Sequence, residues 1–238
     1  MNKDKKQRLE EAIVAIRREY GEEVLRPLGD SGAESAVPHL STGFATLDRA
    51  LGIGGLPKGH LTQLSGIPTS GAMTLACKVL AQATGEAVVC IDLSRTFDVD
   101  YAARCGVATD NLLLIQPPTL DHALETLTAL VDTAAAVVLV MDTVEGKRRV
   151  NTPALKRLMA ALHRSRCALL LVERAGTPLL SEKAAVRLHF QRERWLRQRQ
   201  DVNGYRTQVR ILKNQWGRSD QSVRLVIGFS TVVQGDGA

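Results

Sequence analysis

The sequence predicts an α/β fold in which a mainly parallel sheet is flanked by helices and extended by C-terminal antiparallel strands. Between residues 61 and 173, short apolar strands alternate with helical segments, which is typical of a parallel sheet covered on both faces. After residue 185, two segments alternate polar and apolar residues, as antiparallel strands with one exposed face do. The 238 residues are enough to bury one substantial core.

The first 36 residues are expected to be an appendage to a core domain at 37–238. Apolar residues recur at helical spacing within residues 3–20, and polar residues fill the other positions. The members of this apolar stripe are Leu9, Ala12, Ile13, Ile16 and Tyr20. The stretch that follows is rich in Gly, Ser and Pro, so we expect a linker. The stripe then has to pack on its own domain or on a neighbouring molecule.

The core is expected to alternate strands and helices in chain order. The strands are predicted at 61–66, 87–92, 111–116, 136–142 and 167–173, and the helices at 73–84, 98–106, 120–134 and 152–165. The last helix has Thr152 as its expected N-cap and Pro153 at its first position. A hairpin is predicted from strands 186–198 and 205–215, with Asn203 and Gly204 as its turn, and 223–229 adds one more strand.

The composition argues against a membrane, secreted or metal-dependent protein. No apolar run approaches the roughly 18 residues that a membrane span requires. The charged N-terminus has no apolar region of the kind found in secretory signals. The four cysteines form no Cys-x-x-Cys pair, and the five histidines show no metal-ligand spacing. We therefore expect a cytoplasmic protein with reduced thiols and no metal site.

The net charge of +6 is divided unevenly along the chain. Residues 1–145 hold 12 Lys or Arg against 19 Asp or Glu, a net charge of −7, so residues 146–238 carry +13. Such an asymmetry favours an anionic partner for the second half, with nucleic acid as the first candidate. The alternative is a solvated surface on which the two signs happen to segregate.

A glycine-rich stretch, GIPTSGAMT at residues 66–74, has the G-x-x-x-x-G spacing of a phosphate-binding loop. It comes directly after a predicted strand and before a predicted helix, the context in which this spacing indicates a phosphate cradle. An active loop has lysine and then serine or threonine after its second glycine. Here Ala72 and Met73 occupy those positions, and Thr74 follows.

The surrounding residues resemble the bacterial RecA recombinases. The segment LSTGFATLDRALGIGGLPKGHLTQLSG at 40–66 is similar to the lead-in to their nucleotide site. The similarity continues through 101–107, through 110–113 with Gln116 and Pro117 beyond, and to Lys213 and Asn214. It covers about residues 5 to 229, and it implies a RecA-like P-loop NTPase core.

The departures from that family predict a degenerate nucleotide site. The resemblance puts the phosphate-gripping lysine at Ala72, the metal-ligating hydroxyl at Met73 and the glutamate that activates water at Ser94. The loss of one charge-assisted contact costs roughly 1.5–3 kcal/mol. Phosphoryl transfer depends on positioning and on charge stabilisation, and the three groups that provide them in the family are absent here. We therefore expect no ATP hydrolysis and no catalytic residue, so that the protein is a pseudo-ATPase rather than an enzyme.

Parts of the nucleotide site are expected to survive in vestigial form. The expected contacts are Gly66, Gly71, Thr74, Asp98, Tyr101 and Asp142. The resemblance implies that Asp98 and Tyr101 contact adenine and that Asp142 reaches a metal through water. Alternatively, Tyr101 is a half-buried helix residue and Asp142 caps a neighbouring loop. We expect that no cofactor is required and that ATP or ADP binds weakly.

A basic surface in the second half is predicted to bind single-stranded DNA. The expected contacts are Lys147, Arg148, Arg149, Lys156, Arg157, Arg192, Arg194, Trp195, Arg197, Arg199, Arg210 and Lys213. Guanidinium groups that pair with phosphates beside aromatic rings that stack on bases suit a single strand. The alternatives are a solvated sheet face with the tryptophans in the core, or a surface for an acidic protein.

Within the superfamily, the degenerate loop and short chain resemble the ImuA-type paralogues. This implies a non-hydrolysing accessory protein in DNA repair and damage-induced (SOS) mutagenesis. The expected partners are DNA, a RecA filament or another copy docked through residues 5–20, and an error-prone DNA polymerase. One rival is a DNA-dependent ATPase or recombinase with substitute residues such as Arg95 and Thr74. Another is a scaffold that binds no DNA.

Overall fold

The computed structural model describes residues 7, 10–15, 37–141, 152–174, 180, 182–198 and 201–229. The chain divides into two units, Met1–Ala36 and Val37–Ala238, which are described separately. In the first unit, residues 10–15 are helical, within the helix predicted at 3–20. Ile13 is half-buried there and Ala12 is exposed, while the rest of the predicted apolar stripe lies outside the described residues.

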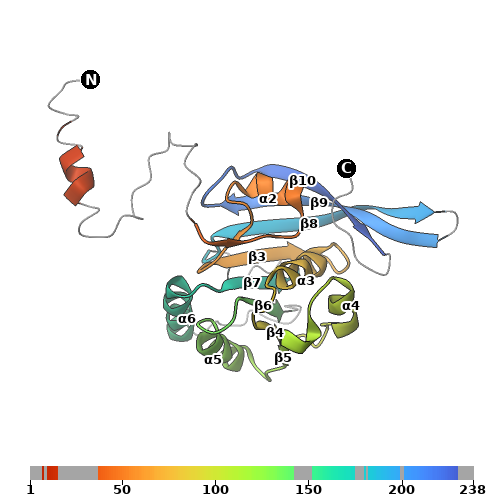
Figure 1. Ribbon diagram of the computed structural model, residues 1–238, viewed down its shortest axis with the longest axis horizontal. Coiled ribbons are helices and arrows are strands. Elements are labelled where there is room, and N and C mark those ends of the chain that lie inside the picture. The colour runs from red at the N-terminus through yellow and green to blue at the C-terminus, as the bar shows by residue number, and fades with distance from the viewer. Residues whose placement is uncertain are drawn as a thin grey trace. The chain divides into compact units, whose positions relative to one another are not determined.

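The second unit is built on an eight-stranded sheet with the order β10-β9-β8-β3-β7-β6-β4-β5 (Figure 1). Its strands are β3 (Leu61–Gly66), β4 (Val88–Asp92), β5 (Leu112–Ile115), β6 (Ala136–Met141), β7 (Ala168–Glu173), β8 (Val186–Gln198), β9 (Asp201–Asn214) and β10 (Gln221–Gly228). Strands β3 to β8 pair in parallel, whereas β9 and β10 are added by antiparallel pairing. The predicted fold class is confirmed.

Helices cover both faces of the parallel strands. They are α3 (Ala72–Gln82), α4 (Val99–Arg104), α5 (Leu120–Leu130) and α6 (Thr152–Arg164), with a 3-10 turn, η2, at Thr109–Asn111. The core has two layers, one containing buried residues of α3 and the other those of α5 and α6. In Figure 1, α5 and α6 lie together, away from α3. Among the described residues, no helix is long and apolar enough to cross a bilayer.

A short helix, α2 (Ala45–Leu51), is present where the sequence analysis identified none. Its carboxylate Asp48 accepts hydrogen bonds from Ser41 Oγ at 2.6 Å and from the Thr42 backbone N–H at 2.9 Å. The helix ends at Gly52, whose φ of 81° is the left-handed conformation that glycine adopts without strain. Just before and after α2, β1 (His39–Leu40) and β2 (Leu56–Pro57) pair antiparallel.

The predicted turn of the hairpin is wrong by several residues. Asn203 and Gly204 lie inside β9, and the last pair of the β8–β9 ladder is Gln198 with Asp201. The physical reason is the approach of β10, because a Cβ on Gly204 would collide with the carbonyl oxygen of Ile227. Glycine is needed there for close strand contact rather than for a turn.

Candidate nucleotide cleft and nucleic-acid surface

The glycine loop leaves the end of β3 and leads directly into α3, as its spacing predicts. Gly71 has a φ of 109°, and a Cβ there would lie 3.1 Å from Ile227 Cδ1. At the other end of the loop, a Cβ on Gly66 would lie 2.8 Å from the carbonyl oxygen of Phe190. Both glycines therefore allow the antiparallel strands to pack closely against the loop.

A cleft of about 430 Å³ opens beside this loop. One wall is the whole of 66–74, and the lining also includes Ser94, Asp98, Tyr101 and Arg174. The remaining wall is formed by the ends of β6 and β7 and by three aromatic rings from the C-terminal part of the chain. Its volume is within the range of sites that hold a small-molecule ligand.

All five described residues that were predicted to contact nucleotide line this cleft: Gly66, Gly71, Thr74, Asp98 and Tyr101. Thr74 Oγ1 lies 2.7 Å from the hydroxyl oxygen of Tyr101 and 3.1 Å from that of Tyr205. Asp98 is the N-cap of α4 and accepts the Tyr101 backbone N–H at 2.9 Å. Burial raises the pKa of both tyrosines, so both phenols stay protonated at neutral pH. Asp142, the sixth predicted contact, lies outside the described residues.

The described part of the loop does not fit a magnesium site of the kind the resemblance implies. Met73 offers no oxygen ligand, and the hydroxyl of Thr74 is engaged with two phenols. No group of three or more His, Cys, Asp or Glu within the described residues could hold a metal ion.

Two hydroxyl groups of the cleft have no hydrogen-bond partner within the described part of the chain. They are Ser70 Oγ and Ser94 Oγ, both buried, and both residues line the cleft. A buried hydroxyl without a partner costs free energy, so such groups indicate a place where water or a ligand supplies the missing bond.

One arginine lines the cleft, and a second contacts two of the residues that line it. Arg192 of β8 donates from Nη1 to Thr69 Oγ1 and to the Thr69 carbonyl oxygen, the latter at 3.5 Å. Its guanidinium also lies 4.3 Å from the centre of the Trp195 ring. Arg174 lines the cleft at the end of β7. The substitute cation that the sequence analysis considered, Arg95, is exposed and is absent from the lining.

The aromatic wall of the cleft was not predicted from the sequence. The rings of Trp195, Tyr205 and Phe229 form a cluster, in which the Tyr205 centroid lies 5.7 Å from each of the others and those two lie 6.3 Å apart. Trp195 and Phe229 are each 41% exposed. The sequence signal is weak, because the three residues come from three different strands or strand ends and meet only through strand pairing.

A buried polar chain connects the end of β7 to β8. Glu173, which is 2% exposed, accepts a hydrogen bond from Gln63 Nε2. The amide oxygen of Gln63 in turn accepts from Arg187 Nε at 2.7 Å. The carboxylate at the cleft is thereby tied to the antiparallel part of the sheet.

The predicted DNA contacts do not form one surface. Lys156 and Arg157 are exposed on α6, whereas the others that are described lie on β8 and β9. On these strands Arg194, Arg197 and Arg210 are exposed, Arg192 and Lys213 are half-buried, and Trp195 lies at the cleft. Four predicted contacts lie outside the described residues: Lys147, Arg148, Arg149 and Arg199.

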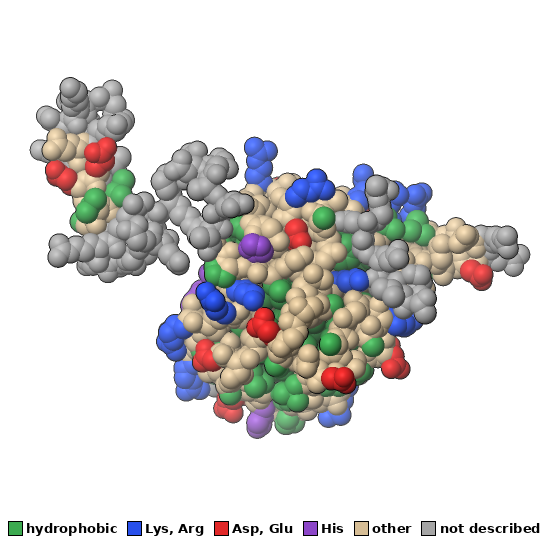
Figure 2. All heavy atoms as spheres, viewed as in Figure 1, with side chains coloured by type: hydrophobic (Ala, Val, Ile, Leu, Met, Phe, Trp, Pro, Cys, Tyr) green, Lys and Arg blue, Asp and Glu red, His purple; other side chains and the backbone are tan. Residues whose placement is uncertain are grey.

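The strands β8, β9 and β10 present one face to the core and the other to solvent. Along β9, Tyr205, Thr207, Val209 and Ile211 are buried, and the residues between them are half-buried or exposed. We call the solvent side the outer face. In Figure 2, Lys and Arg side chains project from the upper edge, where Figure 1 places β9 and β10.

Like charges stand opposite each other on this outer face. The register pairs Arg194 with Arg206, and Arg187 with Lys213. His189 is paired with Arg210, and burial together with this arginine lowers the pKa of the imidazole. Like charges directly opposite on neighbouring strands destabilise a sheet.

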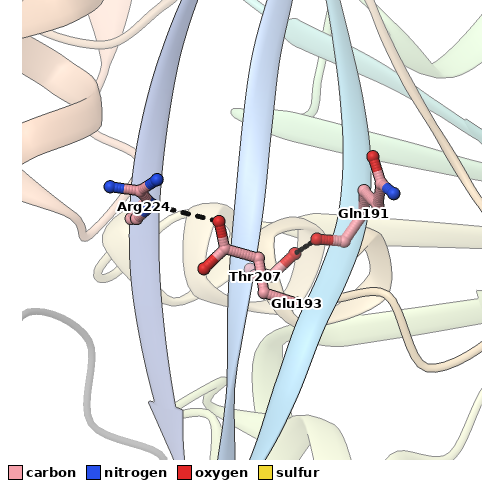
Figure 3. A network of polar contacts seen from close by, with 4 residues as sticks. All are labelled: Gln191, Glu193, Thr207 and Arg224. Carbon is pink, nitrogen blue, oxygen red and sulfur yellow. Dashed lines mark hydrogen bonds and ion pairs between the residues drawn. The ribbon is translucent and has the colours of Figure 1, made fainter.

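One ion pair on the outer face crosses β9 and joins β8 to β10. Arg224 Nε donates to Glu193 Oε1 at 3.0 Å (Figure 3). In the same view, the hydroxyl of Thr207 lies 3.2 Å from the Gln191 carbonyl oxygen. Thr207 also donates to the Ser70 carbonyl oxygen at 2.7 Å, so β9 holds the glycine loop directly.

A parallel sheet flanked by helices, with a glycine loop between its first long strand and a helix, defines the class of RecA-like P-loop proteins. The structure is similar to the crystal structure of the RadB recombinase, with a TM-score of 0.64 over 82% of this chain and 98% of that one, at 17% identity. A family model described as the RecA N-terminal domain matches residues 7–148.

Relatives named Protein RecA match over most of the chain. That of Blastochloris viridis is 34% identical, covering 89% of this chain and 71% of the relative. That of Geobacter sulfurreducens is 30% identical, covering 100% and 80%. The chain belongs to the RecA family.

Our prediction that the chain is not an enzyme is contradicted by these similarities. The relatives carry the name RecA, the structural neighbour is a recombinase, and none of these similarities points to a pseudo-enzyme. The sequence reasoning weighed only Arg95 as a substitute cation within this chain, because residues far from the loop in the sequence give no sign that they approach it. The fold brings Arg192 to the loop from more than a hundred residues away, and Arg174 to the cleft.

Proposed function

We propose that this protein acts in DNA recombination and repair by binding a nucleotide in the cleft and single-stranded DNA on the outer face. The observation that carries the proposal is the pair of buried, unpartnered hydroxyls of Ser70 and Ser94 in a cleft bounded by the glycine loop. A ligand with several hydrogen-bonding oxygens would satisfy both groups.

The chemistry of the cleft suits a nucleotide. The N-terminus of the eleven-residue helix α3 adjoins the loop, and the backbone N–H groups of such a terminus favour an anion. Farther along the lining, Tyr101 and Asp98 offer an aromatic side chain and a carboxylate of the kind that hold a purine base. Nucleotide turnover stimulated by DNA is the activity expected of a member of this family.

The chemistry of the outer face suits the phosphate backbone of a single strand. The opposed pair Arg194 and Arg206 is unfavourable in the free protein, and so is the pair Arg187 and Lys213. A polyanion placed across these pairs would turn the repulsion into attraction and release its own counterions. The exposed residues Arg197 and Arg210 extend the same surface along β8 and β9.

We further propose that the protein works beside a RecA filament as an accessory protein in the response to DNA damage. The support is the family relationship together with the helical segment at 10–15, whose Val14 is 65% exposed. Residues 5–20 would dock on the filament or on another copy of this chain, and an error-prone polymerase would be recruited to the same complex. A pull-down from damaged cells, with and without residues 1–20, tests this part.

Nucleotide binding is tested by calorimetric titration of the whole chain with ATP, ADP and adenosine, followed by phosphate-release measurements with and without single-stranded DNA. The proposal expects ATP to bind and DNA to increase its turnover. It is overturned if none of the three ligands binds at millimolar concentration.

DNA binding is tested with a labelled single strand over a series of salt concentrations. For the unchanged protein, the affinity should fall steeply with salt, by about 0.7 decades per decade of salt for each phosphate neutralised. The double variant Arg194→Glu and Arg210→Glu should bind far more weakly and show a shallower slope. Arg49→Glu, an exposed arginine on α2, is the matched control. Equal binding by the double variant and the control contradicts the proposal.

A further inference from the structure

Arg192 differs from the other arginines of β8 in facing the glycine loop instead of the outer face. It is paired with Thr207, whose side chain is fully buried, and not with another cation. Its guanidinium donates to the side-chain and backbone oxygens of Thr69, which lines the cleft. It also covers the ring of Trp195, another residue of the lining. Arg192 is therefore a cation at the rim of the cleft.

The residue that Arg192 contacts has a strained backbone. Thr69 has a φ of 60°, a left-handed conformation that is rare and strained for a β-branched residue. Arg192 contacts both oxygens of this residue. Such outliers persist where the surroundings enforce them, and they cluster at sites that clamp ligands.

The neighbouring residue supplies an independent sign of a ligand. Ser70 is 1% exposed, and its Oγ has no partner in the described part of the chain. This oxygen lies inside the loop, against the position that a Cβ of Gly66 would take. The carbonyl oxygen of Ser70 accepts a hydrogen bond from Thr207 at 2.7 Å, which fixes the loop backbone beside this hydroxyl.

We propose that Arg192 supplies the positive charge for an anionic group bound at the glycine loop, replacing a cation at position 72. The inference rests on the proposed nucleotide cleft. When a phosphate group enters, the guanidinium exchanges its bonds to Thr69 for charge-assisted bonds to the phosphate, and Ser70 Oγ donates to the same group. Adenosine, which carries no phosphate, gains nothing from this exchange.

Arg192 is favoured over Arg174 for this role because of what each touches. Arg192 bonds to the loop itself, whereas Arg174 follows β7 on the side of the cleft formed by Val172 and Glu173. An anion held by the loop and by the N-terminus of α3 therefore lies closer to Arg192 than to Arg174.

The experiment compares ligands that share adenosine and differ in the number of phosphate groups. Adenosine, ADP and ATP are titrated by calorimetry into the whole chain and into the variants R192Q, R192K, R174Q and R49Q, with thermal unfolding of each free variant as a check on folding. For R192Q we expect ATP affinity to fall about 10- to 100-fold while adenosine affinity is unchanged. R192K should recover part of the loss, and R49Q should behave as the unchanged protein.

The outcomes separate this inference from the proposed function. If R192Q weakens ATP and adenosine equally, Arg192 only supports Trp195 and the inference is wrong. If R174Q reproduces the selective loss and R192Q does not, the cation is Arg174, and the nucleotide cleft still stands. If the unchanged protein binds none of the ligands, the proposed nucleotide function is wrong, and the inference about Arg192 is wrong with it.

Discussion

The parallel and antiparallel halves of the sheet have different tasks in this molecule. Every residue of β4, β6 and β7 is buried, so these strands contribute mainly core. In β9, buried and polar residues alternate, and the buried ones hold the glycine loop while the polar ones build the outer face. The parallel half, which is buried on both faces, supports the cleft at the ends of β6 and β7. The antiparallel half has one free face, so it can contact the glycine loop with its buried side and present the outer face with its other side.

The largest expected difference between the halves concerns the cost of removing an apolar side chain. Leu139→Ala in β6 should destabilise the protein by about 2–5 kcal/mol, because Leu139 is 2% exposed and its loss leaves a cavity. Val202→Ala near the tip of the hairpin, where Val202 is 41% exposed, should cost within about 0.5 kcal/mol. Urea unfolding of both variants measures this. Equal losses would show that the hairpin is as firmly packed as the core.

A second substitution tests the close contact of β9 with β10. Gly204→Ala should destabilise by about 1–3 kcal/mol, since the added methyl group would meet the Ile227 carbonyl oxygen. Asn203→Ala, the adjacent exposed position of the same strand, is the control and should cost no more than about 0.5 kcal/mol. If the two positions prove equally tolerant in thermal unfolding, the strand pairing described here is wrong at this point.

A third substitution separates stability from DNA binding on the outer face. Arg206→Gln removes one of two arginines that stand opposite each other, so the free protein should gain about 0.2–1 kcal/mol. Affinity for single-stranded DNA should fall at the same time, because a phosphate contact is lost. Arg206→Lys should leave both nearly unchanged. Changes of the same sign in stability and affinity would contradict the assignment of this face to a polyanion.

The smallest effect is expected at the ion pair between Arg224 and Glu193. Arg224 is 69% exposed, and exposed pairs contribute between about 0 and 1 kcal/mol. Glu193→Gln should therefore barely change the unfolding midpoint, yet it removes the acid that opposes the basic outer face. DNA affinity is expected to rise slightly at low salt and to match the unchanged protein at high salt. A large loss of stability would mean that the pair holds the three strands together.

The hydrophobic pattern of the sequence predicted most of the sheet, because this pattern depends on residues that are close together in the chain. Strands 61–66 and 186–198 were predicted at their observed bounds, since apolar runs and strict alternation are local signals. The helix α2 was missed because it is only seven residues long and its N-cap, Phe44, makes no side-chain cap bond. The turn was misplaced because Gly204 serves a contact with another strand, which no short window of sequence reveals.

The site was less predictable than the fold for the same reason. Gly66, Gly71, Thr74, Asp98 and Tyr101 lie within one span of 36 residues, and they meet at the cleft. The rings of Tyr205 and Phe229 and the contact between Arg192 and Thr69 depend on how distant strands pair. Charge counting likewise found the basic half of the chain but could not distinguish the arginine that faces the loop from those that face solvent.

The hydrogen bond from Thr207 to Ser70 has a consequence for the exchange of segments among relatives. A hairpin grafted from a relative in the RecA family would bring its own buried residues into contact with a glycine loop that they were not selected to fit. Chimeras that transplant 186–229 alone should therefore be less stable than chimeras that carry 61–82 along with the hairpin, as thermal unfolding would measure. Although 61–82 and 186–229 lie far apart in the sequence, a change in one of them at this contact calls for a matching change in the other.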